Sequence, residues 1–200
     1  MRLYISYGAV LMEDGKDKKS SGTMRKLFEG TVDPKTQKRF HASEDVLHLL
    51  LQLNKKQNLQ MRYHTPDGNF DSPLLMLAVR YAPSRFAEIM CAQDPGALKE
   101  HMIFSGGMML SVVGALSDRI KNSKTTAEFK ECMQILEVLL VDAKIDLLEI
   151  DKYHESKLSH FAMLWNATKN AKHDLNLLKK AIIDKRGEEE FKKCLGTLKK

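Results

Sequence analysis

DGNFDSPLLMLAVRYAPSRFAEIMC, residues 67–91, is the stretch that decides the fold. It opens with turn residues, after which Ser72 and Pro73 read as a helix N-cap followed by proline at the first helical position. Apolar residues then predict a short helix over 74–81, an Ala-Pro-Ser break, and a second helix over 85–91. A turn, a helix, a break and a helix in so few residues indicate one unit of a helical repeat protein.

The residues upstream of this unit divide into a β-rich start and one helix. Residues 2–12 are rich in Tyr, Ile, Val and Leu and end at an acidic turn, which predicts a strand. Ser43 precedes two acidic residues and a leucine-rich run, which predicts a helix that its neighbours cover on most sides. We interpret residues 1–42 as a small β-rich or irregular cap and residues 59–70 as a loop.

Downstream, apolar segments recur at intervals that suit further helices. They are residues 108–116, 127–141, 156–167, 174–183 and 188–198. The polar segment 117–126 reads as an insertion, and the segment 142–153 reads as a connector. The pattern predicts that helix pairs continue along most of the chain.

Three heptapeptides within these segments can be laid over one another. They are SPLLMLA at 72–78, MMLSVVG at 108–114 and SKLSHFA at 156–162. Leu74, Leu110 and Leu158 hold the third place, and a small residue that permits close helix packing holds the seventh. The longer of the two intervals contains the polar insertion. This spacing predicts three helical units in phase.

The first heptapeptide resembles the start of an ankyrin repeat, whose hallmark reads Thr-Pro-Leu-His-x-Ala-Ala. Pro73, Leu74 and Ala78 match the hallmark, and Ser72 stands for its threonine. The resemblance covers residues 43–184, although the middle unit keeps almost none of the motif. It implies a mainly α, ankyrin-like helical solenoid of about three to four divergent repeats. A generic irregular helical bundle with accidental spacing is the alternative.

This resemblance divides the chain into three parts. They are a β-rich or irregular cap at 1–42, an ankyrin-like helical repeat domain at 43–184, and a basic C-terminal tail or short helix at 185–200.

Ankyrin-like units bind partners with their loop tips and their first-helix face, so the resemblance implies a non-catalytic protein–protein interaction module. The implied partner-binding residues are Arg62, Tyr63, His64, Phe104, Tyr153 and His154. Exposed aromatic residues beside arginine are good interface anchors. The alternative is that these aromatic rings stack on one another or cap the core. Met102, Met108 and Met109 either add an adaptable binding surface or fill the core.

The sequence contains no pattern that indicates catalysis, a metal or a cofactor. Its seven histidines are scattered, without an HExxH motif or a His–Cys pair at zinc spacing. His160 falls on a first helix, where the hallmark imidazole bonds loop backbone, so we expect a structural role for it. Cys91 and Cys132 lie on apolar helix faces, and we expect buried thiols. The alternative is an enzyme whose cysteine and histidine meet only in space.

The charge and the cysteines bound the setting of the protein. The net charge of +6 leaves a basic nucleic-acid-binding domain as a further alternative. The basic residues are not interleaved with aromatics, so we expect a solvated surface instead. Three cysteines without a CxxC pair fit a reducing compartment, and we expect neither a membrane span nor a signal peptide. We therefore expect a cytoplasmic protein, or one secreted into a host cell cytoplasm.

The C-terminal residues carry one further resemblance. Glu188, Glu189 and Glu190 precede a short apolar and basic end. This looks like the tail signal of effectors that intracellular bacteria inject through type IV secretion, which implies a host protein as the partner. A helix with glutamates early and lysines late, as its dipole favours, explains the same residues.

Overall fold

The computed structural model describes residues 27–36, 39–57, 62–64, 71–103, 107–154 and 156–198. Within these residues the protein is mainly helical, with small antiparallel sheets. The strand predicted at 2–12 lies outside the described residues. None of the helices described is both long enough and apolar enough to cross a membrane.

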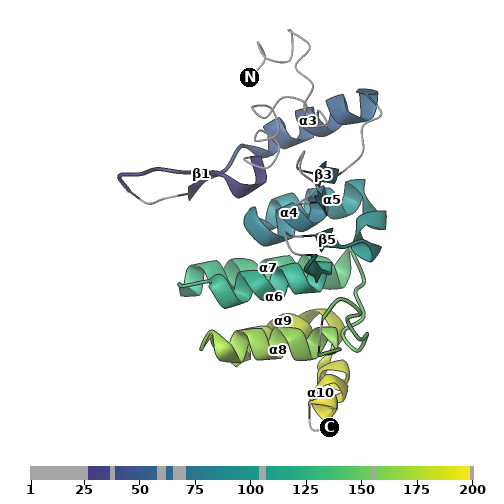
Figure 1. Cartoon of the computed structure of the whole chain (residues 1–200). Coiled ribbons are helices and arrows are strands. Elements are labelled where there is room, and N and C mark those ends of the chain that lie inside the picture. The colour runs from purple at the N-terminus through teal and green to yellow at the C-terminus, as the bar shows by residue number, and fades with distance from the viewer. Residues whose placement is uncertain are drawn as a thin grey trace.

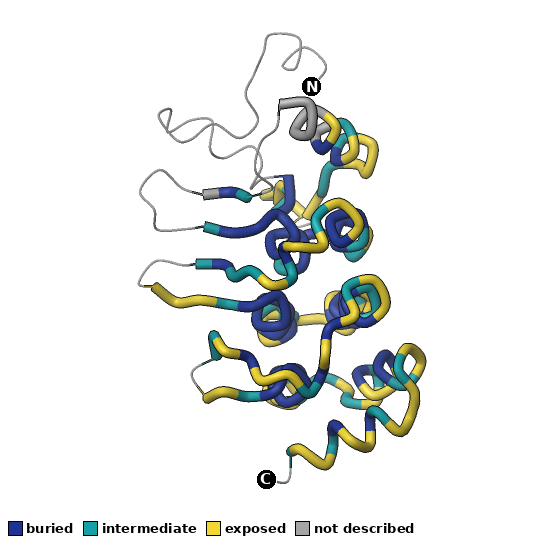
Figure 2. Tube along the Cα trace, turned by 90° about the vertical axis from the view of Figure 1, so that its right-hand side faces the viewer, coloured by how far each residue is buried: buried dark blue, intermediate teal, exposed yellow. Residues whose placement is uncertain are grey.

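Three helix pairs follow one another along the chain. They are α4 (Leu74–Tyr81) with α5 (Ser84–Gln93), α6 (Val112–Asn122) with α7 (Thr126–Val141), and α8 (His160–Asn170) with α9 (Leu175–Arg186). The first helices α4, α6 and α8 contact one another in that order, and so do the second helices α5, α7 and α9. Figure 2 shows the result as two columns of helices seen end-on. We call this arrangement the stack.

Both ends of the stack are covered by further helices. At the N-terminal end α3 (Glu44–Gln57) contacts α5, and the ring of Phe28 packs edge-on against Phe86 of α5, with 6.1 Å between ring centroids. At the other end α10 (Glu188–Thr197) contacts α8 and α9, and its Phe191 packs against aromatic residues of α8. Each end therefore buries aromatic side chains that a bare repeat end would expose to water.

β-Hairpins precede the first helices and project from one side of the stack, at the left in Figure 2, which we call the hairpin edge. Four strands form one antiparallel sheet in the order β3 (Arg62–His64), β4 (Asp71–Pro73), β5 (Met102–Ile103) and β6 (Met109–Leu110). A bridge between Ile150 and Ser159 marks a third hairpin before α8. The segment 59–70 was predicted as a loop, but β3 lies within it. Strands of two or three residues are too short to show an alternating pattern.

One more hairpin lies near the N-terminal end of the stack. It pairs β1 (Thr31–Val32) with β2 (Arg39–Phe40), and it extends to the left of the stack in Figure 1. This ribbon falls within the region predicted to be β-rich.

The short turns within the helix pairs lie on the other side of the stack, which we call the turn edge. There Arg119 of α6 donates hydrogen bonds to the carbonyl oxygens of Val79, at 3.0 Å, and Ala82, at 2.6 Å, at the end of α4. His173 precedes α9, and its Nε2 lies 2.7 Å from the Oγ of Ser123 in the turn before α7. Polar side chains therefore tie each unit to the preceding one at the turn edge.

The helix predicted over 74–81 is confirmed, but its start differs in detail. Pro73 occupies the N-cap position with an extended backbone, φ −55° and ψ 143°. Ser72 does not cap the helix, because its hydroxyl donates to the carbonyl of Pro73 at 2.9 Å. Proline at this position fixes the extended conformation that leads out of β4 and into the helix.

The helix predicted over residues 108–116 is α6, and it differs from its predicted bounds at both ends. Residues 109–110 pair with β5, so the helix begins at Val112, where the Oγ of Ser111 accepts a hydrogen bond from Gly114 N at 2.9 Å. The helix then continues into the segment 117–126. That segment is therefore not an insertion, but the end of α6 and a short link to α7.

The helix caps show which residues of the three units are equivalent. The caps are Pro73, Ser111 and Ser159. Leu74 follows its cap and is fully buried, whereas Leu110 and Leu158 precede theirs and are half-buried. The heptapeptide alignment is therefore wrong by two residues for the first unit. What recurs is the order of hairpin, first helix and second helix.

Candidate functional site

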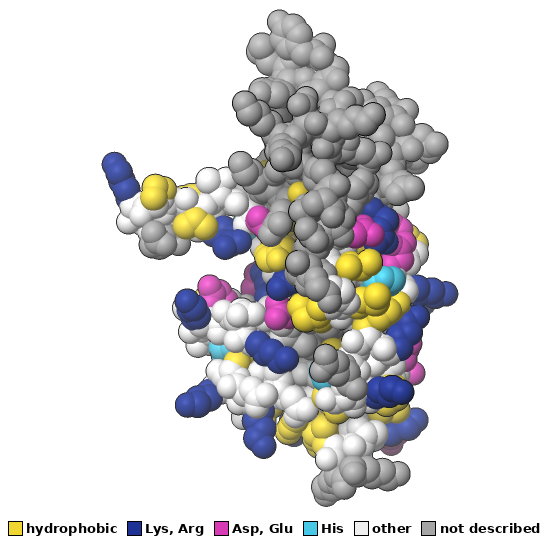
Figure 3. All heavy atoms as spheres, viewed as in Figure 1, with side chains coloured by type: hydrophobic (Ala, Val, Ile, Leu, Met, Phe, Trp, Pro, Cys, Tyr) yellow, Lys and Arg dark blue, Asp and Glu magenta, His cyan; other side chains and the backbone are white. Residues whose placement is uncertain are grey.

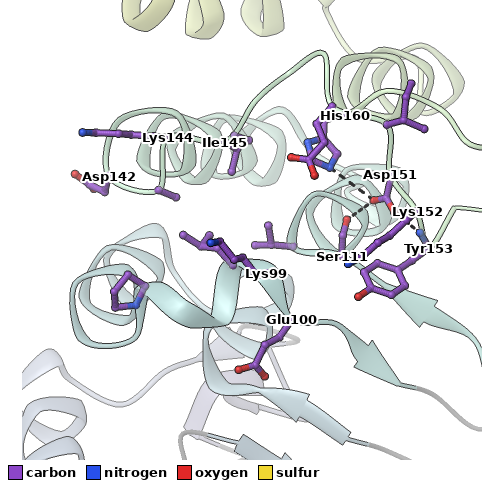
Figure 4. Close-up of a pocket in the computed structure, with 16 residues that line it drawn as sticks. Lys99, Glu100, Ser111, Asp142, Lys144, Ile145, Asp151, Lys152, Tyr153 and His160 are labelled. Carbon is purple, nitrogen blue, oxygen red and sulfur yellow. Dashed lines mark hydrogen bonds and ion pairs between the residues drawn. The ribbon is translucent and has the colours of Figure 1, made fainter.

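A cavity of about 580 Å³ opens at the hairpin edge, between η1 (Pro95–Lys99) and the connector from α7 to α8. Figure 4 shows Lys99 and Glu100 below it and Lys144 and His160 above it. Its charged lining includes Lys99, Lys144 and Lys152 together with Asp142, Glu149 and Asp151. Both signs of charge surround the cavity, so its lining favours neither anions nor cations.

Asp151 is the buried centre of this lining, with 2% of its surface exposed. Its Oδ1 accepts hydrogen bonds from the backbone nitrogens of Tyr153, at 2.8 Å, and His154, at 3.2 Å. Its Oδ2 accepts a hydrogen bond from the hydroxyl of Ser111, the residue that caps α6. A buried carboxylate needs such donors, because it has left its hydration behind.

His160, the first residue of α8, completes what we call the Asp151 cluster, which consists of Ser111, Asp151 and His160. Its Nδ1 lies 2.8 Å from the carbonyl oxygen of Asp146, and its Nε2 lies 4.0 Å from Asp151 Oδ2. The imidazole therefore bonds connector backbone, which confirms the structural role predicted for it. The N-termini of α6 and α8 both lie close to Asp151, and their positive dipole ends favour a carboxylate there.

A serine, an aspartate and a histidine in one cluster invite comparison with a nucleophilic site. In that chemistry a histidine takes the proton of the serine hydroxyl. Here Ser111 donates to Asp151 instead, and its oxygen accepts from Gly114 N. All three side chains are also buried. The Asp151 cluster is therefore a joint between two units, with Ser111 on one and Asp151 and His160 on the next.

Two of the predicted partner-binding residues, Arg62 and Tyr63, lie on the first hairpin, where Arg62 is half-buried and Tyr63 is buried. Arg62 forms a bidentate salt bridge with Asp71, in which Nη2 donates to Oδ2 at 2.8 Å and Nε donates to Oδ1 at 3.1 Å. It forms a further ion pair with Glu100. Tyr63 is only 8% exposed, so its ring belongs to the core. This agrees with the alternative that the aromatic residues cap the core. The side chain of His64 lies outside what the structure describes.

Tyr153 and His154 lie on the third hairpin. The ring of Tyr153 lies against the ring of His101, with 4.8 Å between centroids, and Lys152 Nζ lies 5.0 Å from the centre of the tyrosine ring. His154 accepts a hydrogen bond from the backbone nitrogen of Ser156 at 3.2 Å. Tyr153 and His154 are half-buried, and both lie between Ile150 and Ser159, the paired residues of the third hairpin. Phe104 lies outside the described residues.

Three apolar side chains at the hairpin edge are exposed; Met108 and Met109 were predicted either to add a binding surface or to fill the core, and Ile150 was not predicted as a contact residue. Met108 is 55% exposed, Met109 is 40% exposed, and Ile150 is 54% exposed. Met102, by contrast, is fully buried, so the methionine cluster divides between surface and core. The two glycines that precede Met108 in the sequence were the available signal, because glycine favours turns and turns lie at the protein surface.

The cysteines are buried and carry raised pKa values. Burial raises the pKa of Cys91 to about 12, with a further contribution from the negative charge of Asp142. Burial also raises the pKa of Cys132 and of Cys194 to about 11. Thiols with such values stay protonated at neutral pH and are poor nucleophiles. Among the described residues, no group of three or more His, Cys, Asp or Glu side chains could hold a metal ion.

Comparisons with known proteins do not indicate a function for this chain. No protein-family model, curated protein or solved structure matches it. The hairpin edge combines a cavity of mixed charge, a buried ionic joint and exposed apolar tips. Such a surface can bind another protein, because apolar tips supply buried area and the mixed charges supply pairing at the rim.

Proposed function

We propose that this chain is a divergent ankyrin-like repeat protein that binds a folded protein partner without catalysis. The ordered recurrence of hairpin, first helix and second helix supports the proposal. So does the stacking of like helices on like. A stack of this kind holds its hairpins in fixed positions, so a partner can bind to several at once without ordering them first. The contact surface in this proposal is the hairpin edge together with the adjoining face of the first helices.

One observation carries the proposal: exposed apolar side chains stand on successive hairpins. Met108 and Met109 belong to the second hairpin, and Ile150 belongs to the third. The hydrogen bond between Ser111 and Asp151 brings these two hairpins side by side. Neighbouring exposed apolar side chains mark interaction sites. Tyr153, which follows Ile150 on the third hairpin, adds an aromatic contact.

The experiment is protein capture with a matched pair of double variants. The test variant changes Met108→Ser with Ile150→Ser. The control variant changes Val32→Ser with Phe40→Ser, two residues of the β1–β2 hairpin that are 40% and 59% exposed away from the hairpin edge. We expect the test variant to lose at least one partner from a cross-linked eukaryotic lysate by about tenfold, because buried apolar anchors dominate interface energies. The control should retain it.

Two results would contradict this proposal. One is equal capture of every partner by wild type and the test variant. The other is an equal loss in the control, which would mean that exposed apolar side chains bind nonspecifically wherever they lie. Thermal unfolding of both variants, measured by circular dichroism, excludes a loss of folding as the cause.

The biological setting that we propose is a secreted bacterial effector that acts on a host protein in the host cytoplasm. The glutamate cluster Glu188–Glu190, at the start of α10, supports it by its resemblance to a type IV secretion signal. The test is translocation of the full chain into host cells, with the three glutamates changed to glutamine. We expect translocation to fall. Unchanged translocation would contradict the setting but not the protein-binding function.

A further inference from the structure

We propose that the turn edge is a second interaction surface, which binds an acidic segment of a protein partner. Its contact residues, which we call the turn lysines, are Lys121, Lys124, Lys169 and Lys172. All four are exposed. They lie at the ends of α6 and α8 or in the turns that follow, and these two helices pack side by side in the stack. Figure 3 shows Lys and Arg side chains projecting from this side of the molecule.

The carboxylates of the turn edge are occupied by bonds within the protein. Asp118 pairs with Arg80 at 2.7 Å. Glu128 accepts hydrogen bonds from the backbone nitrogens of Lys124, at 2.6 Å, and Thr125, at 3.1 Å. Asp174 is likewise used as the cap of α9. These acidic groups therefore accept bonds from helix N-termini and from arginine, and the charge of Lys124 adds to the backbone hydrogen bonds that lower the pKa of Glu128.

The turn lysines have no such engagement. Within the described part of the chain, no ion pair joins any of their ammonium groups to a carboxylate. Lysine at a helix C-terminus interacts favourably with the dipole, which explains one lysine per helix end. It does not explain why the following link to α7 adds Lys124 and the following link to α9 adds Lys172. Four cations on two adjacent turns therefore remain available to an external anion.

The two turns are held in a fixed relation to each other. His173 Nε2 lies 2.7 Å from Ser123 Oγ, which joins the turn after α8 to the turn after α6. The imidazole also stacks on Phe129, with 4.3 Å between centroids and 9° between planes. A rigid backbone presents the four charges together, so a bound partner need not order the two turns first.

The chemistry of this surface favours a protein partner over the other polyanions. Phe129 is buried and His173 is stacked upon it, so the two turns present no free aromatic face on which a nucleic-acid base could stack. No large exposed apolar residue of the described chain lies in these turns to insert into a lipid surface. Lysine ammonium groups are compact point charges that pair with single carboxylates. An acidic protein segment supplies such carboxylates along one strand.

The experiment measures binding of a fluorescein-labelled peptide of alternating glutamate and glycine, about 12 residues long, by anisotropy at several salt concentrations. The test variant changes all four turn lysines to glutamine. The matched control changes four exposed lysines of the hairpin edge to glutamine, so it carries the same net charge; they are Lys99, Lys144, Lys152 and Lys157. We expect wild type to bind the peptide more weakly as salt rises. The test variant should lose about tenfold in affinity and the control less than about twofold.

Three results would overturn the proposal. The first is no binding of the peptide by wild type at about 50 mM salt. The second is an equal loss in both variants, which would assign the binding to net charge alone. The third is tighter binding of a DNA duplex, or of vesicles that contain phosphatidylserine, through the same four lysines. None of these outcomes bears on the hairpin edge, because its contact residues are unchanged in the test variant.

Discussion

The hairpin edge and the turn edge each join neighbouring units, with charges of opposite sign. At the hairpin edge, where α6 and α8 begin, the joint is the carboxylate of Asp151. At the turn edge, where α4 ends, the joint is the guanidinium of Arg119, which donates to two carbonyl oxygens. Helix N-termini favour anions and C-termini favour cations. The direction of the first helices therefore sets the sign of the charge that each edge can bury.

The direction of the helices also explains which side chains each edge leaves exposed. The carboxylates of the turn edge serve the N-termini of the second helices, as Glu128 and Asp174 do. The cations that remain make that edge basic. At the hairpin edge the charges are mixed, and the exposed groups are instead the apolar tips of the hairpins. One stack thus offers an apolar surface on one side and a cationic surface on the other.

Removing the anionic joint should have the largest effect. The change Asp151→Ala leaves the hydroxyl of Ser111 and the backbone N–H groups of Tyr153 and His154 without their acceptor. We expect a loss of about 3 kcal/mol in the free energy of unfolding, because buried donors are left unpaired. Urea denaturation at neutral pH, followed by circular dichroism, measures it. Asp151→Asn keeps one acceptor oxygen and should lose about half as much.

If the free energy of unfolding of Asp151→Ala lies within about 1 kcal/mol of the wild-type value, Asp151 does not join the two units at the hairpin edge. Such a value would mean that the third hairpin is held by its other contacts, such as the backbone bond from His160 N to the Glu149 carbonyl. The cluster would then be a consequence of the stack and not one of its joints.

Removing the cationic joint should have a smaller effect. Arg119→Met keeps the length of the side chain but leaves the carbonyls of Val79 and Ala82 without that donor. We expect a loss of about 2 kcal/mol in the free energy of unfolding. The matched control is Arg85→Met. Arg85 is 53% exposed and pairs with Glu44 and Glu88 at the surface.

Exposed ion pairs contribute little, so the control should change stability by less than about 1 kcal/mol. Equal losses in the two variants would show that the charge of the arginine matters and its position at the end of α4 does not. That outcome would remove Arg119 from the role of a joint between units.

Helix pairs could be predicted from the sequence because their signals are local. The apolar run from Leu74 to Tyr81 ends at a proline break, and α7 begins with the capping box of Thr125 and Glu128. Each signal lies within one or two turns of the helix that it defines. The presence and order of these helices therefore follow from short segments read one at a time.

The hairpins and the joints could not be predicted, because they depend on residues that meet only in the stack. Tyr63 is buried because β3 pairs with β4, which places it opposite Ser72 and against the core. Ser111 and Asp151 belong to different units and meet because α8 packs on α6. Asp151 in a charged connector looks like a surface residue. Only the stacking shows that it is buried.

The smallest effect we predict is a pH dependence of stability that comes from two buried thiols, one beside Asp142 and one beside Arg119. Cys91 lies near the hairpin edge beside Asp142, whose charge raises its pKa further, to about 12. Cys132 lies near Arg119, whose charge opposes the effect of burial, and its pKa is about 11. Both values exceed the ordinary value of 9.0 for an exposed thiol. The unfolded chain therefore releases these protons first, and stability that is complete below pH 9 falls as pH rises above it.

Cys91→Ala and Cys132→Ala isolate these two contributions, because the other groups that titrate are common to both variants and wild type. The loss of stability between pH 7 and pH 10 should be smaller than that of wild type in each variant, by about 1 kcal/mol. Urea midpoints over this pH range measure the difference. An unchanged pH dependence in both variants would mean that burial does not raise the pKa of these thiols in the folded state.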